Sequence, residues 1–436
     1  MPIADEWLAH APPPRALSGT DRWNVFLSYR SVNRAWVLNL YDVLRELGHK
    51  VFLDQIVLRA GDQLIRALQD GLKASQAGVL IWSSATQDSE WVEREYETLE
   101  RLATERRDFR FVPIRLDHSK LPLFAGNRIF LDFADYPDGP NGGELLRLLH
   151  AIAGLPLSDD AARFAAEQDA AAQQAANKIT AAIEIGNASR LIGLFQEDGL
   201  PWRVSAALAC KAAEGLTKLG RNDEALTMLK QVEAQFPKAI RPKQLRALAL
   251  ARRAAKSKNK DELDEAQEIL AELRAAGEHD PETLGIYGRT WMDRYEADRD
   301  ESSLRKSRDL YGQAFDGAQD DYYTGINAAA KSVLLGTPAD LEKANGYAAR
   351  VLELVGSNAW PGDYWKTATV AEAFLMQKNY AQAAELYRTA VAIAPKETGS
   401  HDTTWMQASR LMAKLGASAE EQALINGAFG RMAARQ

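Results

Sequence analysis

The feature that most constrains this 436-residue chain is a change of pattern near Gly154. Before it, short apolar runs alternate with segments of helical spacing, which is the βαβ pattern of a parallel, doubly wound sheet. After it, strand-like runs are absent, and alanine-rich segments with helical spacing continue almost to Gln436. The sequence therefore predicts an α/β domain followed by an all-α region.

The α/β part contains five strand-like runs, at residues 24–29, 50–54, 77–83, 109–116 and 128–133. The residues before them are rich in proline and polar side chains, which predicts a flexible arm. We expect four segments: an arm over 1–21, the α/β domain over 22–154, a helical connector over 155–178 and a helical domain over 179–436.

Composition argues against several classes of protein. The chain has 53 Lys and Arg against 60 Asp and Glu, a net charge of −7, which disfavours a nucleic-acid partner. Cys210 is its single cysteine, and its histidines lack ligand spacing, so neither a disulfide framework nor a metal site is expected. Because no apolar stretch is long enough for a membrane span and no secretory signal is present, we expect a cytoplasmic protein without a membrane partner.

Polar side chains follow three of the predicted strands. They are Ser28, Tyr29, Arg30 and Ser31 after the first, Asp54 after the second, and Ser83 and Ser84 after the third. Ligands of open parallel sheets bind outside the carboxyl ends of the strands, so these residues are candidate ligand contacts. The first turn lacks the glycines of a dinucleotide-binding fold, and Ser83 stands where a phosphoacceptor receiver has aspartate, so both of those assignments are excluded.

Five segments, in order, resemble the Toll/interleukin-1 receptor (TIR) domain. They are VFLSYR at 25–30, VFLD with LRAGD at 51–62, VLIWS at 79–83, WVERE at 91–95 and FVPI at 111–114. The resemblance covers about residues 22–153 and implies a flavodoxin-like five-stranded parallel sheet. The fourth segment is similar to the Trp-x-x-x-Glu of TIR domains that cleave NAD+, which implies NAD+ as substrate and no separate cofactor.

In that family the bond between nicotinamide and ribose is cleaved, giving nicotinamide and ADP-ribose or a cyclic ADP-ribose. The resemblance assigns the catalytic carboxylate to Glu95, which would orient the ribose and stabilise its developing positive charge. Spacing predicts a buried helix stripe and places Trp91 and Glu95 on a stripe beside it; the buried residues would be Val92, Tyr96, Leu99 and Ala103. An acid that only faces solvent is the alternative for Glu95.

Each remaining candidate has two interpretations. Arg30 and Ser31 hold a phosphate or the ribose, or are only solvated. The segment from Asp54 to Asp62, with Leu58 and Gly61, is expected to be a mobile loop that gates the cleft, and a catalytic role is its alternative. Ser83 and Ser84 contact the ligand or cap the next helix. Trp91 covers the ribose or nicotinamide, or closes the edge of the core.

The all-α part contains a period of 34 residues. Residues 364–395 and 206–237 both place small, large and proline residues as a tetratricopeptide unit does; in the first unit these are Ala371, Phe374, Ala383, Tyr387, Ala390 and Pro395. The segment DYYTGINAA at 321–329 also resembles the TRAF-binding region of apoptosis-signal-regulating kinases, which is itself tetratricopeptide-like. We expect a solenoid of helical hairpins and, for Cys210, a packed core thiol.

The resemblances together imply an oligomeric TIR NAD+ glycohydrolase that self-associates through its TIR domains. An unknown protein or small molecule bound by the repeats would act as trigger, and the expected role is bacterial antiphage defence. Removing residues 155–436 should then change the rate of NAD+ cleavage. The alternative is a non-enzymatic adaptor that signals through TIR–TIR contacts and a partner of the repeats.

Overall fold

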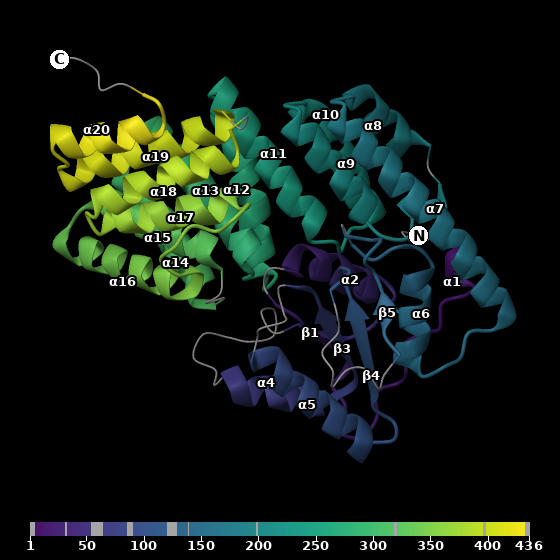
Figure 1. Cartoon of the computed structure of the whole chain (residues 1–436). Helices are drawn as coiled ribbons and strands as arrows, with labels where there is room; N and C mark the ends of the chain where they lie inside the picture. The colour runs from purple at the N-terminus through teal and green to yellow at the C-terminus, as the bar shows by residue number, and fades with distance from the viewer. Residues whose placement is uncertain are drawn as a thin grey trace. The chain divides into compact units, whose positions relative to one another are not determined.

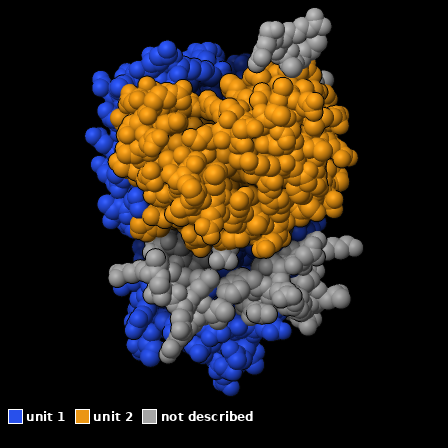
Figure 2. Space-filling view, turned by 90° about the vertical axis from the view of Figure 1, so that its left-hand side faces the viewer, with its two compact units in different colours: residues 1–278 blue, residues 279–436 orange. Residues whose placement is uncertain are grey.

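A computed structural model gives the architecture of the chain (Figure 1). It describes residues 5–30, 33–53, 64–84, 90–119, 129–137, 139–197, 199–317, 321–395 and 398–431, with the backbone alone at 64–67, 90–95 and 398–399. The chain forms two compact units, residues 1–278 and residues 279–436 (Figure 2). Each unit is described by itself below.

A five-stranded parallel sheet lies in the first unit, as predicted. Its strands are β1 (Trp23–Ser28), β2 (Val51–Phe52), β3 (Ser75–Trp82), β4 (Arg110–Arg115) and β5 (Leu131–Asp132). They are arranged in the order β2-β1-β3-β4-β5, which is the flavodoxin-like order. Every residue of β3 is buried, because the middle strand of such a sheet is covered on both faces.

Helices cover both faces of the sheet (Figure 1). On one face, α4 (Leu64–Lys73) and α5 (Glu90–Glu105) pack on aromatic side chains of the strands, including Phe26 and Trp82. On the other face lie α2 (Arg34–Glu46) and α6 (Gly142–Ala153), where the Trp36 indole donates to the carbonyl of Tyr136 at 2.8 Å. This doubly wound arrangement confirms the predicted α/β class.

A glycine in β3 sets how closely α5 approaches the sheet. A Cβ atom at Gly78 would lie 2.1 Å from Cδ2 of Leu99, which is fully buried in α5. Tyr96 and Leu102 are buried on the same helix. The buried face of α5 therefore includes Leu102, which the sequence analysis did not place there, whereas Ala103 is only partly buried.

The N-terminal segment was expected to be a flexible arm, but its described part, residues 5–21, packs on the first unit. Trp7, in the short helix α1 (Asp5–Leu8), is completely buried, and the His10 ring stacks on Phe164 at 4.4 Å between centroids. Arg15 donates to the carbonyl of Asp108 at 2.9 Å. Burying a large apolar side chain such as Trp7 stabilises the folded state by about 2–3 kcal/mol. This gain outweighs the preference of the nearby proline and glycine residues for irregular structure.

The rest of the first unit is helical. Consecutive helices pack on one another: α7 (Asp159–Glu184), α8 (Ala188–Gln196), the 3₁₀ helix η4 (Leu200–Trp202), α9 (Ala207–Lys218), α10 (Asn222–Gln235), α11 (Arg241–Ser257) and α12 (Lys260–Ala275). Cys210 of α9 is 3% exposed, and burial raises the pKa of its thiol. The prediction of a packed core thiol is confirmed.

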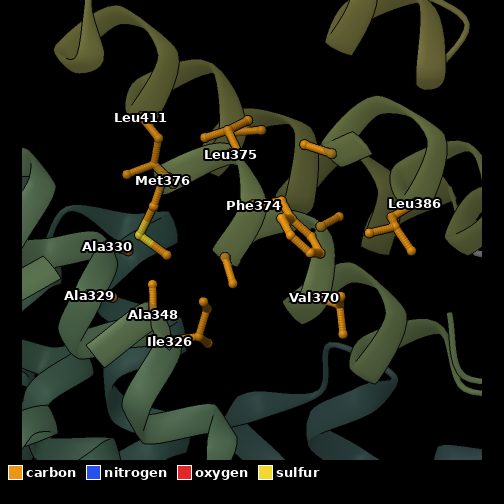
Figure 3. Packing of buried hydrophobic residues seen from close by; sticks show 14 of the residues in the cluster. Ile326, Ala329, Ala330, Ala348, Val370, Phe374, Leu375, Met376, Leu386 and Leu411 are labelled. Carbon is orange, nitrogen blue, oxygen red and sulfur yellow. The ribbon is translucent and has the colours of Figure 1, made fainter. Parts of the chain in front are cut away.

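The second unit consists of helical hairpins. Its helices are α13 (Pro281–Asp298), α14 (Glu301–Gly317), α15 (Tyr322–Leu335), α16 (Pro338–Val355), α17 (Tyr364–Met376), α18 (Tyr380–Ile393), α19 (Thr398–Leu415) and α20 (Ala419–Ala428). Ala371 and Ala383 are fully buried where α17 and α18 pack together, and Phe374 extends into the adjoining core (Figure 3). The small and large positions thus do what the 34-residue period predicts.

Gly325 of α15 shows why a glycine lies in the DYYTGINAA segment. A Cβ atom there would lie 2.8 Å from Val351 of α16 and 2.9 Å from Phe315 of α14. The glycine therefore lets neighbouring hairpins pack closely.

Over the ranges described above, no helix is both long enough and apolar enough to cross a membrane.

Candidate active site at the carboxyl ends of the strands

The candidate site lies where the chain order of the sheet reverses, between β1 and β3. Ser28, the last residue of β1, pairs with Leu80, so the residues after Ser28 lie beside the end of β3. Ser28 and Ser83 are both buried, while Tyr29 and Arg30 are half-buried. The structure thus brings together the predicted residues after the first and third strands, at the point where open α/β sheets bind ligands.

Asn33 connects the two strand ends and was not among the predicted residues. Its side-chain amide donates to the hydroxyl of Ser83 at 2.9 Å. Asn33 directly precedes α2 but makes no side-chain bond to the first turn of that helix. An asparagine before a helix is normally interpreted as a cap. Here the side chain of Asn33 bonds Ser83, fifty positions away, instead of capping the helix. No local sequence pattern indicates such a contact.

Asp117 is a second residue that the sequence analysis missed. Its carboxylate accepts from the backbone N–H of Ser84 at 2.7 Å and from that of Ser119 at 3.0 Å. Partial burial acts to raise its pKa, but these hydrogen bonds bring the pKa of Asp117 below its ordinary value. The edge therefore holds an ionised carboxylate just beyond β4. An acid directly after the fourth apolar run was the available signal.

The outer end of the same edge is closed by an internal ion pair. Arg115, which ends β4, pairs with Asp132 of β5, and its guanidinium lies 4.8 Å from the centroid of the Phe130 ring. Partial burial acts to raise the pKa of Asp132, but the hydrogen bonds from Arg115 and the Ala134 N–H hold that pKa below its ordinary range. Because these charges satisfy each other, the polar groups presented to a ligand lie toward β1 and β3.

Helix α5 follows the carboxyl end of β3, so its first turns lie at the same edge. Trp91 and Glu95 belong to these turns, as predicted, although their side chains lie outside the described residues. Position 95 shares a helix face with Leu99 and Leu102, four and seven residues further on. Both leucines are buried, so that face of α5 packs on the sheet from Leu99 onward, and the role of Glu95 stays a prediction.

Four predicted residues, Ser31, Asp54, Leu58 and Gly61, lie outside the described residues, so their roles stay predictions. Within the described ranges, no group of three or more His, Cys, Asp and Glu side chains is arranged to hold a metal ion.

Two family models match the chain. Residues 25–148 match the TIR domain, and residues 221–335 match the family described as Tetratricopeptide Repeats-Sensor. The sheet and its surrounding helices are therefore a TIR domain, and the helical region contains tetratricopeptide repeats. The predicted TIR domain and the predicted tetratricopeptide repeats are confirmed, and the finer resemblance to the TRAF-binding region stays a prediction.

Three curated relatives are similar to the TIR domain. A probable 2' cyclic ADP-D-ribose synthase, TcpB of Brucella melitensis biotype 1, is 32% identical over 84 residues, 19% of this chain and 34% of that protein. The NAD(+) hydrolase PdTIR of Paracoccus denitrificans is 31% identical over 114 residues, 26% of this chain and 35% of that protein. A probable 2' cyclic ADP-D-ribose synthase, BdTIR of Brachypodium distachyon, is 34% identical over 83 residues, 19% of this chain and 37% of that protein. The chain thus spans about a third of the length of these relatives.

Proposed function

We propose that the chain is a TIR-domain NAD+ glycohydrolase. The observation that carries the proposal is the TIR match over residues 25–148, together with relatives named for NAD+ hydrolysis and for cyclic ADP-ribose synthesis. The site geometry supports it, because Ser28 and Ser83 lie at the carboxyl ends of neighbouring strands, at the edge where such sheets bind ligands. NAD+ is a substrate in this reaction, and no further cofactor is needed.

Cleavage of the bond between nicotinamide and ribose needs little acid catalysis, because nicotinamide departs as a neutral base from a cationic ring. Departure leaves oxocarbenium character on the ribose, which a carboxylate stabilises. Glu95 has that role. Asn33 and Asp117 hold the ends of β1, β3 and β4 in register through Ser83 and Ser84. Attack by water then gives ADP-ribose, and attack from within the substrate gives a cyclic product.

Nicotinamide release by the purified full chain tests the proposal. Glu95→Ala and Glu95→Gln should lower the rate by at least about 100-fold, since both remove the charge that stabilises the transition state. Glu97→Ala is the matched control, because Glu97 is exposed on the same helix, and it should leave the rate unchanged. A rate unaffected by Glu95→Ala would exclude the assigned carboxylate. No release from the full chain or from residues 1–278 would favour the adaptor.

The repeats are proposed to regulate the TIR domain in response to a bound trigger. The match to a sensor family supports this, as does the packing of the first repeats with the TIR domain in one compact unit. Comparing NAD+ cleavage by the full chain and by residues 1–278 tests it: equal rates would contradict regulation by the second unit.

Two further proposals have their own tests. Light scattering with and without NAD+ tests whether the TIR domains self-associate. Phage plaque counts in cells that carry the chain or its Glu95→Ala variant test a role in defence inside the cytoplasm.

A further inference from the structure

Helix α2 of the TIR domain carries two acidic residues one turn apart, Asp42 and Glu46, that are almost completely buried. Asp42 is 4% exposed, and the Glu46 side chain is 6% exposed. A helix on the outside of a doubly wound sheet normally exposes such residues to solvent. Here the first tetratricopeptide helices cover them, around a cavity of about 10 Å³ that is also lined by Val43, Val204, Ala206, Phe236 and Ala239.

The buried carboxylates satisfy backbone groups of the repeats. Asp42 Oδ2 accepts from the N–H of Ile240 at 2.9 Å, and Glu46 Oε1 accepts from the N–H of Lys238 at 3.1 Å. Ile240 is the N-cap residue of α11, and its own side chain has no oxygen to cap that helix. The N–H groups of the first turn need an acceptor and carry partial positive charge, so a carboxylate is the preferred partner. Asp42 therefore caps α11 from another domain.

A second cap runs in the opposite direction. Asp169 of α7 accepts from the N–H of Gly143 at 2.6 Å and from that of Glu144 at 3.2 Å, at the start of α6 in the TIR domain. Arg147 and the Tyr136 hydroxyl hold the same carboxylate, at 2.8 and 2.6 Å. The helices that follow the TIR domain are therefore joined to it by directional bonds as well as by apolar contact, from Asp42 to α11 and from Asp169 of α7 to α6.

The charged groups around Asp42 come from four elements. On α2 itself are Arg45 and Glu46, with the Arg45 guanidinium 3.7 Å from the carboxylate of Glu278, beyond α12. In the α10–α11 turn and the start of α11 are Lys238 and Arg241, and Arg241 is held by Glu214 of α9 at 2.8 Å. Asp42 Oδ1 is buried and has no hydrogen-bond partner. The hydrogen bonds of Asp42 to the repeats go to backbone groups at the start of α11, at Ile240 and Arg241.

Helix α2 extends from this cap to the candidate active site. Asn33, which directly precedes the helix, donates to Ser83 at the end of β3, and Asp42 lies about two and a half turns later. We propose that Asp42 is an interdomain latch through which the repeats position the active-site edge: a shift of α11 moves α2 as a rigid rod and so moves Asn33 against Ser83. This inference names the regulation of the site assigned above and rests on the proposed function.

Hydrogen exchange measured by mass spectrometry on the full chain tests the latch. Asp42→Ala should raise exchange about tenfold at the start of α11 and also along α2 and at residues 28–30, because the cap and the connection are both lost. Asp42→Asn retains an acceptor oxygen and should restore most of the protection. Asp363→Ala is the matched control, since Asp363 caps α17 by accepting from the N–H of Lys366 at 2.9 Å; its effect should stay at α17.

Two outcomes overturn the inference. If Asp42→Ala changes exchange only at the start of α11, Asp42 is a local cap and no latch. If Asn33→Ala and Asp42→Ala change exchange in β3 additively, the two ends of α2 are not coupled. Exchange does not depend on turnover, so these results stand whether or not NAD+ is cleaved. The absence of nicotinamide release from both the wild-type full chain and residues 1–278 would instead overturn the proposed function.

Discussion

At the scale of single residues, His49 has a buried ring whose protonation is costly. It lies between α2 and β2, is 6% exposed, and neither ring nitrogen has a hydrogen-bond partner. Burial lowers its pKa to about 4 from 6.5. The unfolded chain therefore takes up a proton below pH 6.5 while the folded protein does not until about pH 4, so stability falls as pH falls through this window.

His49→Leu should remove that pH dependence. Between pH 7 and pH 4, wild type should lose about 3 kcal/mol more free energy of unfolding than the variant, as converted from the difference in pKa. Urea unfolding of both proteins across this range measures the difference. Parallel curves for the two proteins would show that the ring is solvated or paired in solution.

Some residues of the candidate site could be predicted from local sequence, whereas the roles of others depend on contacts between distant segments. Ser28 and Ser83 could be predicted, because a polar residue that follows an apolar run in a βαβ pattern lies at the ligand-binding edge. Asp117 directly follows the fourth apolar run, so the same rule could have selected it, although its bond to Ser84 joins segments 33 residues apart. Asn33 could not be predicted, because its role depends on a contact with Ser83, 50 residues away. His49 likewise follows a turn, and only the fold buries it.

At the scale of elements, the caps explain what helix patterns missed. Ile240 has no side-chain oxygen, so the local signal for the start of α11 is Pro242 in its first turn and the cap comes from Asp42, whereas Ser418 and Glu421 form a capping box at α20. In α5, spacing alone placed Tyr96 and Leu99 correctly in the core, and the side chain of Val92 lies outside the described residues. Spacing placed Ala103 in the core where the structure has Leu102, because the roll of a helix depends on its partner, Gly78.

The contact between α6 and α7 gives an element-scale prediction. A Cβ atom at Gly143 would lie 2.2 Å from the carbonyl oxygen of Ala165, so Gly143→Ala must separate the two helices and should cost about 1–3 kcal/mol. Gly193→Ala is the control, because nothing lies within 4 Å of that site in α8 and alanine favours helix by up to about 1 kcal/mol. Thermal unfolding measures both variants. Equal effects of the two substitutions would contradict close α6–α7 packing.

At the scale of the whole molecule, composition and contacts divide the chain differently. The composition changes at residue 154, which marks the end of the βαβ pattern. The boundary between the compact units instead falls between residues 278 and 279 of the chain, because the first repeats pack on the TIR domain. Asn141 donates to the carbonyl of Pro201 at 2.9 Å, and Ser205 donates to that of Pro140 at 2.9 Å. Such contacts leave no trace in local sequence, so the predicted boundary marks a change of fold class rather than of rigidity.

Fragments test which boundary governs stability. Residues 1–278 should unfold in one cooperative transition, whereas residues 22–154 lack the partners of Asp42 and Asn141 and the buried Trp7. At about 1 kcal/mol for each lost hydrogen bond, the shorter fragment should melt at least about 10 °C lower. Residues 1–184 regain Trp7 and Asp169 but not the cap on α11, so they should melt between the two. Equal melting temperatures for 22–154 and 1–278 would show that the TIR domain is stable without its repeats, and the first repeats would then be a separable part.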